Sequence, residues 1–108
     1  MNIVGIIPAR IQSSRLPGKA MKKIHKIPMV GHVYFRSKLS SLLNEVYVAT
    51  CDHKIKNYIK SIGGKVIMTS KSHERAVDRT EEALRKIEKI KKKKIDLIVM
   101  IQGDEPLL

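Results

Sequence analysis

Several classes of protein are excluded by what this sequence has little of. A single cysteine, Cys51, excludes an internal disulfide bond and a zinc site built from several cysteines. Aromatic residues make up only 4% of the chain, too few for the stacking platforms that bind single-stranded nucleic acids. The apolar run from Leu97 to Ile101 is far shorter than the ~20 residues of a membrane span. The first residues lack the features of a secretory signal, so we expect a cytoplasmic protein that does not contact membranes.

The length and the charge of the chain set the next limits. The 108 residues suffice for one domain, and 43% hydrophobic content is typical of a globular protein. The net charge of +12 favours a polyanionic partner. Much of this charge lies in one block, Lys86, Lys89 and Lys91–Lys94, which we interpret as a solvated helix end that complements the helix dipole. A basic module that binds nucleic acid is less favoured but stays open as an alternative, and its binding would fall steeply with salt.

Apolar runs alternate with helical patterns along the chain. Four runs predict strands, at Asn2–Pro8, Glu45–Thr50, Lys65–Thr69 and Ile95–Ile101. Three helices are predicted, from Pro28 to about Leu43, from the capping residue Asp52 to Gly63-Gly64, and from about Ala76 past Ile90. The apolar stripes of the first and last helices consist of Met29, Val33, Leu39, Leu42 and Leu43, and of Ala83, Leu84, Ile87 and Ile90.

This alternation predicts an α/β fold, a Rossmann-like doubly wound sheet of mainly parallel strands. Right-handed crossovers favour the strand order 3-2-1-4. The winding then reverses between the first and fourth strands, and ligands of such sheets bind at the carboxyl ends of the strands at that reversal. The loop Ala9–Lys19 and the loop Gln102–Pro106 are therefore expected to share one crevice.

The first of these loops is cationic. Arg10, Arg15 and Lys19 lie within ten residues, and two guanidinium forks with one mobile ammonium suit a polyphosphate. The loop is not a Walker A motif, because Ser13 and Ala20 stand where that motif needs glycine and a hydroxyl residue. A basic surface loop is the alternative.

The second loop is acidic. Asp104 and Glu105 follow directly on an apolar strand, and Mg²⁺ is typically held by one or two carboxylates together with substrate phosphates. An acidic turn before Pro106 is the alternative. Mg²⁺ is the only cofactor that the residues suggest.

The middle of the chain carries weaker signals. Asp78, near a helix start, is also what the helix dipole favours, and Glu81 with Arg85 has the spacing of an ordinary helical ion pair. Cys51-Asp52-His53 combines three ligand types, but adjacent residues seldom converge on one metal ion, so no metal site is predicted there.

The motifs of both loops resemble those of the sugar-acid cytidylyltransferases, in particular the enzymes for 3-deoxy-manno-octulosonate. The resemblance rests on Ile7–Lys19 (IPARIQSSRLPGK) and Gln102–Leu107 (QGDEPL), with Ile27–Val30 and Val48–Thr50 between them. It covers nearly the whole chain. It implies a fold of the nucleotide-diphospho-sugar transferase type, of which residues 1–108 would be the N-terminal, nucleotide-binding part.

The resemblance also implies an activity. Family members transfer CMP from CTP to a sugar acid and release pyrophosphate, in the synthesis of lipopolysaccharide or surface-glycan precursors. Catalysis would depend on Arg10, Lys19 and Asp104. The triphosphate would be held by Arg10, Arg15 and Lys19, and Asp104 would bind Mg²⁺. The remaining nucleotide contacts would come from Ala9, Asp78, Arg79 and Gln102. The resemblance implies a homodimer for a full-length protein.

Three departures from the family pattern bear on these expectations. Where the family commonly has His-x-Ser-Gly-Thr-Asp-Arg, this chain has the run from His73 to Arg79, with Arg75-Ala76-Val77 in place of the small and hydroxyl residues. A nucleotidyltransferase for another sugar or base therefore stays open. Cys51 stands where an aspartate is usual. Family enzymes also continue well past the turn at Asp104, with a second metal carboxylate and most of the sugar pocket.

Overall fold

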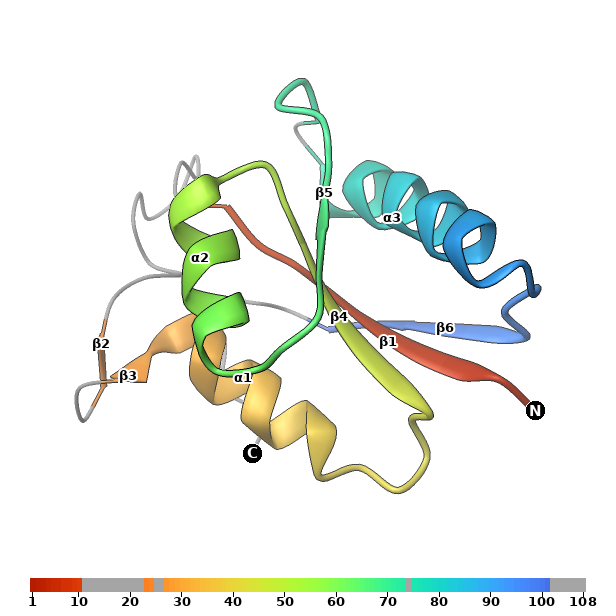
Figure 1. Ribbon diagram of the computed structural model, residues 1–108, viewed down its shortest axis with the longest axis horizontal. Helices are drawn as coiled ribbons and strands as arrows, with labels where there is room; N and C mark the ends of the chain where they lie inside the picture. Colours follow the sequence, from red (N-terminus) through yellow and green to blue (C-terminus); the bar gives the residue numbers. More distant parts are fainter. Residues whose placement is uncertain (11–22, 25–26, 74, 102–108) are drawn as a thin grey trace.

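The structure, a computed structural model, describes residues 1–10, 23–24, 27–73 and 75–101. Nine elements follow one another along these residues (Figure 1). The strands are β1 (Ile3–Pro8), β2 (Lys23–Ile24), β3 (Ile27–Pro28), β4 (Glu45–Thr50), β5 (Val66–Met68) and β6 (Leu97–Met100). The helices are α1 (Met29–Lys38), α2 (His53–Ser61) and α3 (Ala76–Lys91). No helix in these ranges is both long and apolar enough to cross a membrane.

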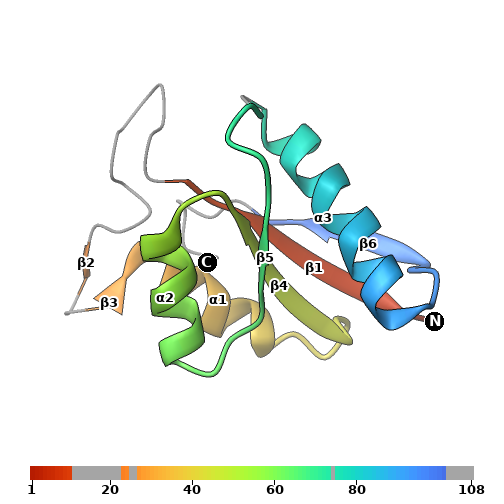
Figure 2. The ribbon, with the colours of Figure 1, turned by 45° about the horizontal axis from the view of Figure 1, so that its top comes forward.

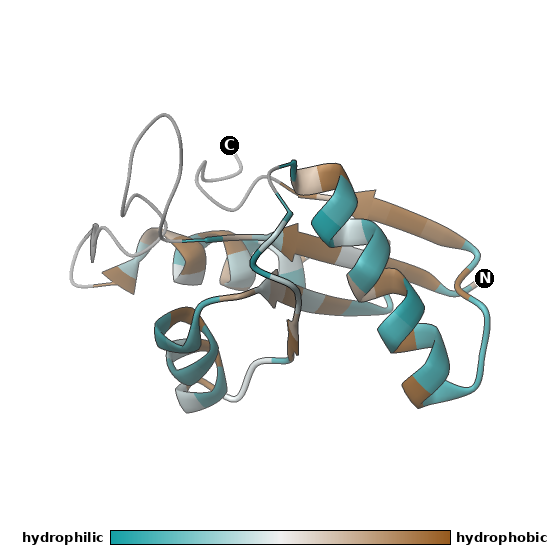
Figure 3. Cartoon of the chain, turned by 90° about the horizontal axis from the view of Figure 1, so that it is seen from above, coloured by the Kyte–Doolittle hydropathy of each residue, from teal (hydrophilic) through white to brown (hydrophobic). Residues whose placement is uncertain are grey.

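The main sheet has four parallel strands in the order β5-β4-β1-β6. These are the third, second, first and fourth of the predicted strands, so the expected α/β fold and strand order are confirmed. Helices α1 and α2 cover one face of the sheet and α3 covers the other (Figures 1 and 2). Figure 3 shows that the strands are mainly hydrophobic, whereas α3 carries hydrophilic residues along its outer side.

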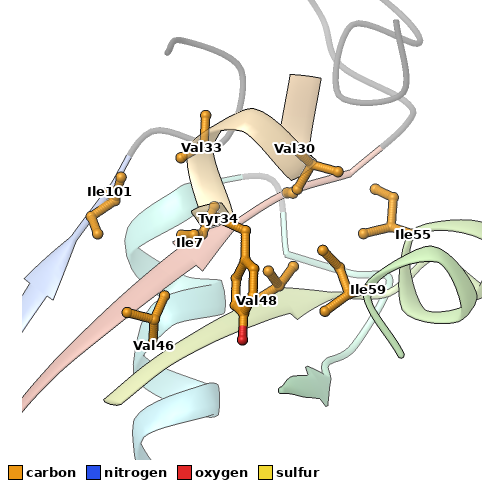
Figure 4. Packing of buried hydrophobic residues seen from close by; sticks show 10 residues of the cluster. Ile7, Val30, Val33, Tyr34, Val46, Val48, Ile55, Ile59 and Ile101 are labelled. Atoms are coloured by element: carbon orange, nitrogen blue, oxygen red, sulfur yellow. The ribbon is translucent and has the colours of Figure 1, made fainter. Parts of the chain in front are cut away.

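Each face of the sheet has its own apolar core. Beneath α1 and α2, side chains of the helices pack on β1 and β4 (Figure 4). This cluster includes Val30, Val33, Tyr34, Ile55, Ile59, Ile7, Val46, Val48 and Ile101. Beneath α3, Ala83 and Ile87 pack on Val4 and Ile6. Because both faces of β1 are covered, its consecutive residues are apolar, and this was the pattern that predicted a buried parallel strand.

The predicted end of the second helix is confirmed. Gly63 adopts a φ of 76°, which favours glycine, and its N–H donates to the carbonyl of Lys60. The N–H of Gly64 donates to the carbonyl of Ile59 at 2.8 Å, so two terminal carbonyls of α2 are satisfied. Asp52 occupies the N-cap position as predicted, but its side chain makes no capping hydrogen bond.

The structure corrects the expected first helix. α1 ends at Lys38 rather than near Leu43, and Leu39 and Leu42 are 84% and 74% exposed. Leu39 and Leu42 keep the apolar spacing of α1, but they lie beyond its end and do not pack on the sheet. Leu43 does reach the core, where it lies against Gly5.

Two smaller features also differ from expectation. Ile90 was assigned to the apolar stripe of the last helix but is 71% exposed. The antiparallel pair β2–β3 was not predicted, because two-residue strands leave no periodicity to detect.

A cluster of charged residues ties the amino ends of two strands to the end of α3. The carboxylate of Glu45 binds Lys65 at 2.5 Å, Lys91, and the hydroxyl of Tyr47 at 3.1 Å. Burial alone would raise the pKa of Glu45, but these hydrogen bonds outweigh it and lower the pKa to about 2. Of the lysine block, Lys91 is thus held in the fold, while Lys92–Lys94 are exposed as predicted.

We expect this cluster to make the protein sensitive to acid. A carboxyl group whose pKa is lower in the folded chain stabilises it above the pKa of the unfolded chain, and this stabilisation is lost as pH falls. For Glu45 the window runs from about 4.5 down to about 2. The contribution at neutral pH is on the order of 2 kcal/mol, because the lysine partners are partly solvated.

Urea unfolding of the wild-type chain and of Glu45→Gln at pH 7, 4 and 3 measures this contribution. The difference in unfolding free energy between the two should shrink as pH falls. Glu81→Gln is the matched control, because Glu81 is half-exposed and pairs only with Arg85 on its own helix in the described part of the chain. A difference for Glu45→Gln that stays constant with pH would contradict the assignment.

Candidate active site

The carboxyl ends of β1, β4, β5 and β6 lie along one edge of the sheet. Hydrogen bonds continue one residue past the strands. The N–H groups of Ala9, Thr69 and Ile101 donate to the carbonyls of Ala49, Thr50 and Ile6, each at 2.9 Å. The backbone is thereby fixed at the points where the loops leave the sheet.

Two of these points belong to the loops singled out from the sequence. Ala9 follows β1 and Ile101 follows β6, and the two strands are neighbours in the sheet. Both predicted loops therefore begin at the same edge, beside the reversal of winding, which is where ligands of such sheets bind. Arg15, Lys19, Gln102 and Asp104 lie outside the described residues, so the crevice that they would share stays a prediction.

Arg10 reaches from the end of β1 to the loop between β5 and α3. Its Nη1 atom donates to the backbone carbonyl of His73 at 3.4 Å, and the side chain is partly buried. Ala9, its neighbour, is 7% exposed and packs in the core beneath α1 and α2. A buried residue directly before Arg10 fixes the place from which the guanidinium projects.

Arg79 is almost completely buried, with 2% of its surface exposed. Its Nη1 atom donates to Thr69 Oγ1 at 2.5 Å and to the carbonyl of Ser70 at 3.3 Å. Its Nη2 atom donates to the carbonyl of His73 at 3.2 Å. Arg79 thus holds the loop between β5 and α3 in place, and its predicted contact with a nucleotide stays a prediction.

Glu82, one turn further along α3, holds the same loop from another side. Its Oε1 atom accepts the N–H of Ser70 at 3.0 Å and lies 2.7 Å from Nε2 of His73. Its Oε2 atom lies 3.0 Å from Nζ of Lys86. The N–H of Ser70 is the main cause that lowers the pKa of Glu82, to about 2, and Lys86 and His73 lower it further against the effect of burial. Glu82 is therefore ionised throughout the ordinary pH range.

Asp78 lies in the first turn of α3, as predicted. Both of its carboxylate oxygens accept hydrogen bonds from Arg75, at 3.1 and 3.2 Å. This fork lowers the pKa of Asp78. Arg75 is one of the residues that depart from the family pattern, and here it binds both carboxylate oxygens of Asp78, a predicted nucleotide-binding residue.

Sequence reasoning missed Glu82, Thr69 and Ser70. The helical spacing of Arg79, Glu82 and Lys86 puts these three charged side chains on one side of α3. This charged side of a helix that follows a polar loop was the only signal in the sequence for the missed contacts. In the described ranges, no three His, Cys, Asp or Glu side chains converge to hold a metal ion. Asp104, the predicted metal ligand, is not among the described residues.

Comparison with known proteins settles the family. The sequence model described as cytidylyltransferase matches residues 4–108. The chain belongs to the cytidylyltransferase family. The resemblance seen in the two loop motifs is thus confirmed.

Individual family members agree with this. The chain is 45% identical over all 108 residues to a 3-deoxy-manno-octulosonate cytidylyltransferase of Geobacter metallireducens, covering 40% of it. It is equally similar to an 8-amino-3,8-dideoxy-manno-octulosonate cytidylyltransferase of Shewanella sediminis, covering 43% of it. The chain therefore spans about two fifths of the length of these curated relatives, and its match lies in cytidylyltransferases that act on sugar acids.

A solved structure from the family has the same fold. CMP:2-keto-3-deoxy-manno-octonic acid synthetase complexed with CTP superposes with a TM-score of 0.89 and 41% sequence identity. The match covers all of this chain and 42% of that protein. The arrangement of β1, β4, β5 and β6 with their helices is thus that of a family member solved with its nucleotide.

Proposed function

We propose that the chain is the nucleotide-binding part of an enzyme that transfers CMP from CTP to a sugar acid of the 3-deoxy-manno-octulosonate type. The observation that carries this proposal is the placement of Ala9 and Ile101 at one sheet edge, because the two family motifs continue from these residues. The names of the matched relatives support the substrate class. A cytoplasmic location, a role in surface-glycan precursor synthesis and a homodimer belong to the same proposal.

The proposed reaction develops negative charge on the leaving pyrophosphate, which the cationic residues of the first loop can stabilise. A hydroxyl oxygen of the sugar acid forms a bond to the α-phosphorus of CTP, the bond from that phosphorus to the β-phosphate oxygen breaks, and the hydroxyl proton is released. Negative charge grows on the departing pyrophosphate. Arg10, Arg15 and Lys19 would hold and neutralise this tail, since such transfer depends mostly on positioning and charge stabilisation. Gln102, Ala9 and the start of α3 would line the nucleoside side.

Asp104 would hold Mg²⁺ in this proposal. Asp104 and Glu105 supply hard carboxylate oxygens a few residues after β6, which ends at the site edge, and this donor type is the one that Mg²⁺ prefers. When bound, the ion would supply positive charge to the phosphate oxygens.

Titration calorimetry of the chain with CTP, in the presence of Mg²⁺, tests the proposal. Arg10→Ala should weaken CTP binding by about tenfold to a hundredfold, because a charge-assisted hydrogen bond to phosphate is lost. Arg85→Ala is the matched control, since Arg85 is exposed on α3 and pairs with Glu81. Absence of CTP binding in this chain and in a longer form of the protein would overturn the proposal.

One observation favours the alternative that the chain binds a nucleotide other than CTP. Arg75 binds Asp78 at the start of α3, where the family pattern has small and hydroxyl residues. A panel of CTP, UTP, GTP and dTTP measured in the same way decides the base. Tighter binding of UTP than of CTP would assign the chain to a nucleotidyltransferase for another base.

A further inference from the structure

The backbone carbonyl of His73 is where three parts of the candidate site meet. It accepts hydrogen bonds from Arg10, which follows β1, and from Arg79, which lies on α3. The carbonyl itself belongs to the loop after β5. The position of Arg10 is thereby coupled to the conformation of a loop that is distant from it in sequence.

Glu82 sets the conformation of this loop. One oxygen of its carboxylate contacts both the N–H of Ser70 and the ring of His73, so it closes the loop between these two residues. Lys86 adds a second restraint. Its ammonium lies 3.0 Å from Oε2 of Glu82 and donates to the carbonyl of Met68 at 2.7 Å. Every one of these bonds comes from a side chain of α3, which therefore carries the loop as a unit.

The bond from Arg10 to His73 is the weakest member of this network. At 3.4 Å between Nη1 and the carbonyl oxygen, it lies near the limit of a hydrogen bond, so a small shift of the loop would break it. A guanidinium is planar and rigid, so a restraint on one of its N–H groups limits the orientations open to the whole group. The loop therefore restricts the directions in which Arg10 can present its donors.

We propose that Glu82 and His73 are positioning residues for Arg10, and that they orient its guanidinium toward the triphosphate of the bound nucleotide. This inference rests on the proposed function. It predicts that a change at Glu82 weakens the grip on the β- and γ-phosphates and leaves the nucleoside contacts intact. Neither residue touches the nucleotide in this scheme.

Glu82→Gln is the variant that tests the inference, and Glu81→Gln is its matched control on the same helix. Glutamine keeps the size and one acceptor oxygen but loses the charge that His73 and Lys86 face. We expect Glu82→Gln to weaken CTP binding by about tenfold and CMP binding by less than about twofold, because only CTP carries the outer phosphates that Arg10 would hold. Glu81→Gln should change neither.

A double-mutant cycle separates positioning from general destabilisation. If Glu82 acts through Arg10, then Glu82→Gln should cause no further loss of CTP affinity when Arg10 is already alanine. Additive losses, equal losses for CTP and CMP, or unchanged binding in Glu82→Gln would each overturn the inference.

A second readout does not need a nucleotide. The Nε–H resonance of Arg10 in a two-dimensional ¹H–¹⁵N NMR spectrum should shift in Glu82→Gln and stay in place in Glu81→Gln. If neither the wild-type chain nor a longer form of the protein binds CTP, the proposed function fails on its own. An unchanged Arg10 resonance would then overturn the positioning role independently.

Discussion

Replacement of Arg79 by methionine is expected to lower the free energy of unfolding by about 3 kcal/mol, because buried acceptors would lose their donor. Arg79 is only 2% exposed, and its guanidinium donates to Thr69 Oγ1 and to the carbonyls of Ser70 and His73. Methionine fills much of the same volume without a donor, so the loss reports on the hydrogen bonds rather than on a cavity. Urea unfolding monitored by circular dichroism measures it.

Arg85→Met provides the comparison for this prediction. Arg85 lies on the same helix, its side chain is 76% exposed, and Glu81 is its ion-pair partner. Surface pairs of this kind contribute little, so the unfolding free energy should change by less than about 0.5 kcal/mol. Equal effects of the two substitutions would show that the network around Arg79 does not stabilise the fold.

Replacement of Asp104 by asparagine should have the largest effect on activity. In a form of the protein that completes the site, Asp104→Asn is expected to lower CMP transfer by at least about 10²-fold, because the carboxylate charge that would hold Mg²⁺ is lost. The fold should survive, since the change is nearly isosteric. Release of pyrophosphate from CTP at several Mg²⁺ concentrations measures the effect, and excess Mg²⁺ should restore part of it.

Asp96→Asn is the matched substitution, because Asp96 precedes β6 in the sequence whereas Asp104 follows it. Asp96 precedes β6 at the amino edge of the sheet, where its carboxylate accepts the N–H of Asn2 at 2.6 Å. Its replacement should leave the rate and the Mg²⁺ dependence unchanged. Turnover of Asp104→Asn near the wild-type rate would refute the metal-binding role, whereas an equal loss in both variants would point to a shared structural cause.

The strand order could be predicted from the sequence because its determinants are local. The run Ile3–Ile7 is apolar on both faces, which is required only of a strand covered on both sides, and the handedness of crossovers then leaves few arrangements. Helix ends were predicted less well. Gly63 ends α2 through its positive φ, but no glycine marks the end of α1. The exposed residues Leu39 and Leu42 happen to keep the helical spacing, so the sequence predicted a longer helix than the structure has.

The residues of the candidate site were also predictable only in part. The motif residues Arg10 and Asp104 could be proposed from residue type and from the strands that precede them. The bracing of the loop after β5 could not, because the contact between Glu82 and the N–H of Ser70 depends on how α3 docks on the sheet. Burial of Arg79 was equally hidden, since arginine is among the residues least often buried and only tertiary contacts reveal its acceptors.

The central place of β1 has a consequence for how the protein is made. β1 precedes both of its partner strands by a long stretch of chain, with Val4 opposite Glu45 and Ile3 opposite Leu97. Contacts so remote along the chain slow folding. A nascent polypeptide leaving the ribosome therefore exposes this apolar segment until β4 and β6 have followed it, and an unpaired apolar strand of this kind is prone to aggregation.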